Sequence, residues 1–171
     1  KSMYLIENPA SLGNSWGVYG AMHYDDGKLY VGYSNQGDYG GYAVYDTLDP
    51  NIDDEYEVVE PLWMTGEEDQ SYYGAGAVTI EDMVVIGGDG GVVSVRNAKT
   101  GEELSKLQLS GKIRCSLVYA DGYIWTTTQG KKIYKLLLSE SGKITVAEEA
   151  DLPNISNASP VVTGGKVYIT G

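Results

Sequence analysis

The stretch "SLVYADGYIWTT" (residues 116–127) consists of a short apolar segment, an Asp-Gly pair and a second apolar segment. Asp-Gly between alternating apolar residues is a strong signal for a β-hairpin, because the turn needs residues that accept positive φ. The same arrangement recurs in "GAMHYDDGKLYVG" (20–32), "GAVTIEDMVVIG" (76–87) and "SPVVTGGKVYITG" (159–171). We therefore predict four related hairpins.

Corresponding positions of these hairpins are occupied by Tyr30, Val85, Trp125 and Tyr168. A third apolar segment follows in "GYAVYD" (41–46), "GVVSVRNAKTG" (91–101) and "KKIYKLLLSESGK" (131–143). A fourth follows in "YEVVEPLWM" (56–64), "EELSKLQL" (102–109) and "ITVAEEA" (144–150). Four antiparallel strands in roughly 40 residues form one propeller blade, so the repeat predicts an all-β propeller.

Residues 1–171 are expected to form one propeller with blades at 17–64, 74–109 and 113–150, a partial blade at 158–171, and an outer strand of a preceding blade at 1–7. A single β-sandwich would share the strand content but not the regular repeat. Because a propeller closes only as a ring of about four to eight blades, we expect a fragment of a larger ring. A ring closed by a second copy and a small closed ring are the alternatives.

The composition limits the partners and the location. The formal net charge is −12, which argues against nucleic acid and anionic membranes as partners. Cys115 is the single cysteine, so an internal disulfide is excluded, and no apolar run is long enough to cross a membrane. Since Lys1 is not a natural start, we expect that a leader has been removed and that the protein is extracellular or on a cell surface.

The stretch "GGDGGVVSVRNAKTGEEL" resembles the repeat of the pyrroloquinoline-quinone-like propellers. That repeat has a Gly-rich turn, an apolar strand, the pattern Asp-Ala-x-Thr-Gly, a charged residue and a Trp. Residues 97–101 match the pattern with Asn97 in place of Asp, but Ser105 stands where the Trp is expected. In the first repeat the Trp is present as Trp63, while the preceding turn is enlarged.

The resemblance implies a rigid platform, because propellers of this type also serve as assembly scaffolds and sensors. Quinoprotein dehydrogenases share the repeat, but they need a pair of adjacent cysteines and a calcium ion beside the cofactor. Cys115 lies between Arg114 and Ser116, so this chain lacks the pair and bound quinone is not expected. An oxidoreductase whose site lies in blades outside this chain is the alternative.

The residues give little support for catalysis. His23, the single histidine, lies in "AMHYDDG", and nothing in the sequence places a nucleophile and an acid beside it. We interpret it as a packed strand residue. The Gly-rich "GGDGG" (87–91) joins two strands rather than a strand and a helix, so it is not a phosphate loop.

An acidic insertion at 49–60 has oxygen-bearing side chains at the spacing of a calcium-binding loop. The candidate ligands are Asp49, Asn51, Asp53, Glu57 and Glu60. Asp54 stands where such a loop normally has Gly, and the flanking segments look like strands. A calcium site and a solvated acidic hairpin are therefore alternative interpretations.

Aromatic residues are concentrated in the connections that emerge at one end of the predicted blades. The candidate ligand-binding residues are Trp16, Tyr39, Tyr42, Tyr72 and Tyr73. Flat rings beside polar groups suit a carbohydrate, and Tyr and Trp are also common anchors for a protein partner. Alternatively, Tyr42 and Tyr73 simply pack between blades.

Three functions remain. The first is a non-catalytic binding or scaffold module, secreted or on a cell surface, that takes a protein or a carbohydrate. The second is part of a quinone- or metal-dependent oxidoreductase. The third is a structural spacer without a ligand.

Overall fold

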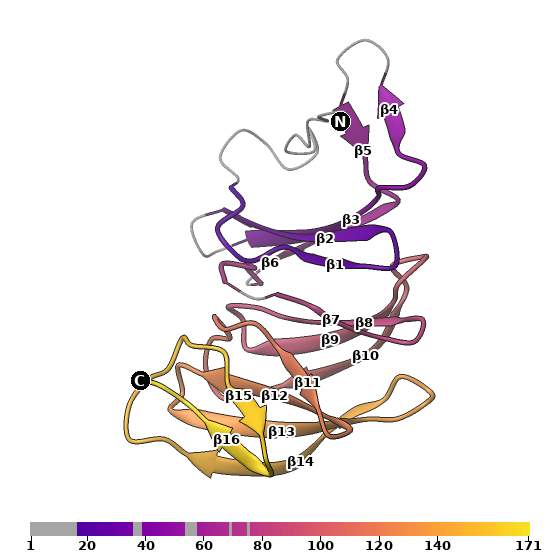
Figure 1. Ribbon diagram of the computed structural model, residues 1–171. Coiled ribbons are helices and arrows are strands. Elements are labelled where there is room, and N and C mark those ends of the chain that lie inside the picture. Colours follow the sequence, from indigo (N-terminus) through magenta and orange to yellow (C-terminus); the bar gives the residue numbers. More distant parts are fainter. Residues whose placement is uncertain (1–16, 36–38, 54–57, 69, 75) are drawn as a thin grey trace.

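The computed structural model describes residues 17–35, 39–53, 58–68, 70–74 and 76–171. Within these ranges every regular element is a β-strand, and no residue lies in a helix. Three four-stranded antiparallel sheets lie face to face in chain order, and a two-stranded hairpin follows them (Figure 1). No helix in this part of the chain is long and apolar enough to span a membrane.

Each sheet is made of strands that lie near one another in the chain. The first contains β1 (His23–Asp25), β2 (Lys28–Asn35), β3 (Tyr39–Asp46) and β6 (Trp63–Glu68). The second contains β7 (Val78–Ile80), β8 (Met83–Gly87), β9 (Val92–Asn97) and β10 (Glu103–Gln108). The third contains β11 (Val118–Ala120), β12 (Tyr123–Thr128), β13 (Lys132–Leu138) and β14 (Ile144–Asp151). The last hairpin consists of β15 (Val161–Thr163) and β16 (Lys166–Tyr168).

The strand register confirms the equivalence of the four hairpins. The second strand of each hairpin places one residue opposite the first residue of its partner, in the pairs Tyr30–His23, Val85–Val78, Trp125–Val118 and Tyr168–Val161. Each turn contains two residues, and positive φ at the first of them is seen at Asp26 (42°), Glu81 (53°) and Asp121 (53°). The turn chemistry therefore fixes the register of every hairpin.

The fourth strand of the first sheet differs from the prediction. We expected it at 56–64, but the strand that pairs with β3 is β6, with Trp63 opposite Val44 and Glu68 opposite Tyr39. The earlier part of the segment forms a separate hairpin of β4 (Asn51–Asp53) and β5 (Val58–Glu60). A hairpin inside the insertion satisfies its own backbone locally, so the sheet resumes only after it. The expected outer strand at 1–7 lies outside the described residues.

Apolar contacts between neighbouring sheets form the core. Along β8, Val84 and Ile86 join a buried cluster with the first sheet, while Val85 joins a cluster with the third sheet. Alternate side chains of a strand point to opposite faces, so a strand covered on both sides must be apolar throughout. This explains the uninterrupted run "MVVI" in β8, whose residues are all buried.

The fourth strands of the first two sheets each contact a turn of the next sheet. The Trp63 indole donates a 2.9 Å hydrogen bond from Nε1 to the carbonyl of Ala98 and lies against Gly101, in the turn between β9 and β10. Ser105 occupies the matching register position in the second sheet, and its hydroxyl donates a 2.6 Å bond to the carbonyl of Gly142. The serine that departs from the family pattern thus contacts the corresponding turn, between β13 and β14.

The two ends of the stack differ. On the first sheet, the face opposite the second sheet carries Val31, Tyr33 and Tyr45, which are buried in a cluster with Val59 of β5. The β4–β5 hairpin stands over this face (Figure 1). The Tyr33 and Tyr45 hydroxyls share a 2.6 Å hydrogen bond within the cluster. We call this covered surface the capped face.

On the third sheet, the face opposite the second sheet is only partly covered by β15 and β16 (Figure 1). Trp125 and Lys135 are half-buried there, and Leu137 is exposed. Trp125 has the register position of Tyr30 and Val85, both of which are buried against the next sheet. We call this surface the open face. A fragment of a larger ring stays the prediction, and closure of the ring by a second copy stays an alternative.

Candidate functional site

Three flat side chains form a row across the ends of the sheets, at the connections that lead into their first strands. Tyr19 lies four residues before β1, Tyr73 five before β7 and Arg114 four before β11. The rings of Tyr19 and Tyr73 are parallel within 10°, with centroids 4.8 Å apart. The Arg114 guanidinium carbon lies 4.9 Å from the Tyr73 centroid. We call these three residues the tyrosine–arginine row.

The buried carboxylate of Asp89 fixes the position of Arg114. Asp89 follows β8, its side chain is 1% exposed, and it accepts hydrogen bonds from Arg114 Nε and Nη2 at 3.0 and 2.6 Å. The Lys112 amine lies 3.6 Å from the same carboxylate. The hydrogen bonds to Asp89 raise the pKa of Arg114. Such a two-point contact holds the guanidinium plane in one orientation against Tyr73.

Close approach of the loops is needed for this stacking. A Cβ at Gly74 would lie 2.3 Å from the carbonyl oxygen of Arg114, so only glycine lets these two connections touch. The same two connections are also joined by a 3.2 Å hydrogen bond from the Gly76 amide to the Ser116 hydroxyl. The row is therefore set by the backbone as well as by its own rings.

The row remains accessible to solvent. Tyr19 is 58% exposed and Tyr73 is 37% exposed, although each ring contacts a neighbour. Tyr73 has Tyr19 on one side and Arg114 on the other, because the three come from connections of successive sheets. Both tyrosines therefore combine a ring contact with partial exposure to solvent.

The predicted aromatic residues are not all at this surface. Tyr42 and Tyr72 are buried between the first and second sheets, where their rings meet edge to face with centroids 5.3 Å apart. Burial raises the pKa of Tyr42 strongly. Of the predicted set, Tyr73 is the residue whose described side chain reaches the surface. The side chain of Tyr39 and all of Trp16 lie outside the described residues.

Sequence reasoning missed Tyr19 and Arg114. The available signal was their place before the first strand of successive repeats, which matches that of Tyr73. Because the spacing to the strand is one residue longer at Tyr73, the match is visible only after the loops are superposed. Arg114 was also considered only as a neighbour of Cys115, which is buried.

The calcium hypothesis stays a prediction. Asn51 lies opposite Glu60 in the β4–β5 ladder, so the backbone of the acidic insertion is a hairpin at these positions. The Asp49 amide donates a 3.0 Å hydrogen bond to Asp46 Oδ1. The side chains of Asn51, Asp53 and Glu57 lie outside the described residues. Among the side chains that are described, no three His, Cys, Asp or Glu residues converge on a point.

His23 joins the first and second sheets through a short polar chain. The Thr79 hydroxyl donates a 2.8 Å hydrogen bond to Asp25 Oδ2, and His23 Nε2 lies 3.0 Å from the same hydroxyl oxygen. Since the single hydroxyl proton is directed to Asp25, Nε2 must be the donor towards Thr79. A general base would need a free lone pair at that nitrogen. Burial lowers the pKa of His23, and Asp25 opposes this shift.

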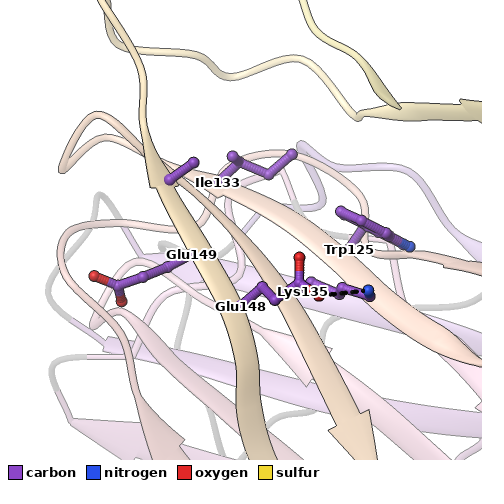
Figure 2. A pocket seen from close by; sticks show the side chains of 6 residues that line it. Trp125, Ile133, Lys135, Glu148 and Glu149 are labelled. Carbon is purple, nitrogen blue, oxygen red and sulfur yellow. Dashed lines mark hydrogen bonds and ion pairs between the residues drawn. The ribbon is translucent and has the colours of Figure 1, made fainter. Parts of the chain in front are cut away.

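A small hollow lies on the open face of the third sheet (Figure 2). Its volume is about 80 Å³, and its lining residues are Trp125, Ile133, Lys135, Glu148, Glu149 and Ala150. The Lys135 amine lies 4.2 Å from the Tyr123 ring centroid and donates a 2.9 Å bond to Glu148 Oε1. Sites for small molecules usually measure about 300 Å³ or more, so this hollow is too small for one.

No known protein family and no curated protein matches the chain. Among solved structures, the computationally designed Ika4 protein matches with a TM-score of 0.70 and 14% identity, over 100% of this chain and 99% of that one. The computationally designed Ika8 protein gives 0.65 and 14%, over 88% of this chain and 41% of its own. BamB from Moraxella catarrhalis gives 0.66 and 13%, over 89% and 43%.

These matches, together with the four-stranded antiparallel sheets, show the class of fold. The protein is an all-β propeller. The chain spans less than half the length of Ika8 and of BamB. At these identities the likeness concerns architecture alone.

Proposed function

We propose that the protein is a non-catalytic binding or scaffold propeller module that acts outside the cytoplasm and takes a protein partner at the tyrosine–arginine row. The observation that carries the proposal is the exposed, parallel stack of Tyr19 and Tyr73, with Arg114 beyond it. Tyr and Arg are the residue types enriched at the energetic centres of protein interfaces. The propeller supplies the rigid support.

The row is organised before a partner arrives. The rings contact each other, and Asp89 holds the guanidinium in place. Ordering a flexible side chain on binding costs about 0.5–1.5 kcal/mol, and a side chain already held in place avoids most of this cost. A protein partner is favoured over a carbohydrate because Tyr19 and Arg114 already contact the ring of Tyr73, so that ring is not open for a sugar to stack on.

Selection from a random-peptide display library tests the proposal, with the 171-residue chain immobilised and a glycan array probed in parallel. The discriminating variant is Tyr19→Leu/Tyr73→Leu, and the matched control is Tyr24→Leu, which replaces a tyrosine that is 60% exposed on β1. Peptides that bind the wild type and the control but not the double variant are expected. No enriched peptide, or equal binding to all three proteins, contradicts the proposal. If glycans bind the wild type but not the double variant, the row binds a carbohydrate and not a protein partner.

The location has its own test. Antibodies against the 171-residue chain should label intact cells that produce the full-length protein. Labelling only after the cells are permeabilised would contradict a position on the cell surface.

A further inference from the structure

We propose that Lys112 and Arg114 together bind a carboxylate from an acidic side chain of the protein partner. This inference rests on the proposed function, since it names the chemical group that the partner presents beside the tyrosine–arginine row. The contact would lie next to Tyr73, whose ring centroid is 4.9 Å from the guanidinium carbon of Arg114.

The charges around Asp89 do not balance. Its side chain is 1% exposed and has two cations beside it, with Arg114 Nη2 at 2.6 Å and the Lys112 amine at 3.6 Å. A buried charge needs a partner of opposite sign, and the two-point contact with Arg114 supplies that partner. One positive charge is therefore left over, and a single carboxylate would balance it. A phosphate would instead bring nearly two negative charges close to Asp89.

Both cations have donors that are still available. The hydrogen bonds of Arg114 within the described part of the chain use Nε and Nη2, so Nη1 has none there, and Nη1 reaches solvent. The Lys112 side chain is 47% exposed, and among the described residues its charged partner is Asp89 alone. An ammonium has three donors. A carboxylate could therefore accept from both residues without breaking the contacts to Asp89.

The backbone fixes the connection that carries both cations. Ile113, which lies between them, is fully buried, and its amide donates a 3.1 Å hydrogen bond to the carbonyl of Gly88. The carbonyl of Lys112 accepts a 2.9 Å bond from the Gln129 amide. The cations are thus presented from a connection whose backbone is already in place, which lowers the ordering cost of binding.

The net charge of −12 limits the kind of acidic partner. A field of this sign repels a strongly acidic segment during association. Salt at physiological concentration screens charges in solvent beyond about 8 Å, whereas the contact with Lys112 and Arg114 is direct. We therefore expect a single aspartate or glutamate within a segment of low net charge, and not an acidic run.

Two probes test the contact on the whole 171-residue chain. The first is sodium acetate, exchanged for sodium chloride at constant ionic strength, with the NMR signals of the Arg114 Nε–H group and the Tyr73 ring as the readout. The second is a peptide enriched in the display selection, synthesised with its acidic residue and again with the matching amide. Its dissociation constants are measured for both forms.

The variants differ in one charge. Lys112→Gln removes the charge, and Lys112→Arg keeps it. The matched control is Lys99→Gln, because the Lys99 side chain is 68% exposed and lies at the opposite end of β9 from Asp89. An unchanged denaturation midpoint shows that Lys112→Gln is folded.

Acetate is expected to shift both NMR signals in the wild type and in Lys99→Gln, and to shift them less in Lys112→Gln. Replacing the acid of the peptide by the amide should weaken binding to the wild type about two- to fivefold, as expected for an exposed ion pair. Lys112→Gln should remove most of this difference, since the coupling needs both charges. Lys112→Arg should retain it.

The inference is overturned if acetate leaves the Arg114 signal in place, if the amide peptide binds the wild type as well as the acidic one, or if Lys99→Gln reduces the difference as much as Lys112→Gln. The display experiment separates the two proposals. Peptides that depend on Tyr19 and Tyr73 but are not enriched in Asp or Glu overturn the carboxylate contact and leave the binding function standing. The absence of any selected peptide overturns both.

Discussion

The capped face of the first sheet and the open face of the third belong to the same repeat, yet the first is buried beneath a hairpin and the second is partly exposed to solvent. Tyr33 and Tyr45 are buried on the capped face beneath the β4–β5 hairpin, with their hydroxyls bonded to each other. On the open face, Lys135 lies between aromatic rings and a glutamate that reaches into solvent. An insertion in one loop thus covers a face of the first sheet with a hairpin of its own.

The difference teaches that the burial of a register position depends on its neighbour and not on the repeat itself. Tyr30 and Trp125 stand at the same place in their hairpins, but only Tyr30 is covered by a following four-stranded sheet. On the first sheet, the β4–β5 hairpin covers the apolar face that lies opposite the second sheet.

The largest expected effect compares one aromatic side chain from each face. Tyr45→Ala should lower the free energy of unfolding by about 3–5 kcal/mol, because it leaves a cavity in a fully buried cluster. Trp125→Ala should lower it by about 1 kcal/mol, since much of the ring already contacts water. Urea denaturation of both variants measures the difference. Equal losses would show that the open face is as well covered as the capped one.

A smaller effect is expected from the hydroxyl pair on the capped face. Tyr33→Phe removes one partner of the 2.6 Å bond and leaves the Tyr45 hydroxyl buried without it, at a cost of about 1–2 kcal/mol. The double variant Tyr33→Phe/Tyr45→Phe should recover part of this loss, because no orphaned group remains. If the two single losses simply add in the double variant, the hydroxyls do not depend on each other.

The smallest effect should come from the ion pair on the open face. Glu148 is exposed, so Glu148→Gln is expected to change the free energy of unfolding by less than about 0.5 kcal/mol. Raising the salt concentration should have little further effect. A loss above about 1 kcal/mol would mean that Glu148 is shielded from solvent, which would contradict an open face.

Much of this fold could be predicted from the sequence, because its signals are local. The pairs Asp26-Gly27 and Asp121-Gly122 specify their turns by themselves, and the alternating residues on either side specify the strands. The fourth strand of the first sheet was placed too early, since "YEVVE" has a good strand pattern of its own and pairs within the insertion. Strand propensity cannot distinguish a hairpin from a sheet edge.

The candidate site was harder to predict from the sequence than the fold. Tyr73 was a candidate because of its type, but its partners are 41 and 54 residues away in the chain, at Arg114 and Tyr19. Their contact depends on the distance between sheets and on Gly74, and neither is visible in a residue pattern. Tyr42 on β3 and Tyr72 in the connection before β7 have the same residue type, but both are buried between the first and second sheets.

The hydrogen bond from Trp63 to the Ala98 carbonyl has a consequence for the unfolding of the molecule. It means that an early part of the chain relies on an acceptor made later, and Ser105 repeats this dependence one sheet further on. Removal of the carboxyl-terminal sheets would therefore leave a side-chain donor, Trp63 or Ser105, without its acceptor in the part of the protein that is kept. Individual sheets should melt together rather than in succession.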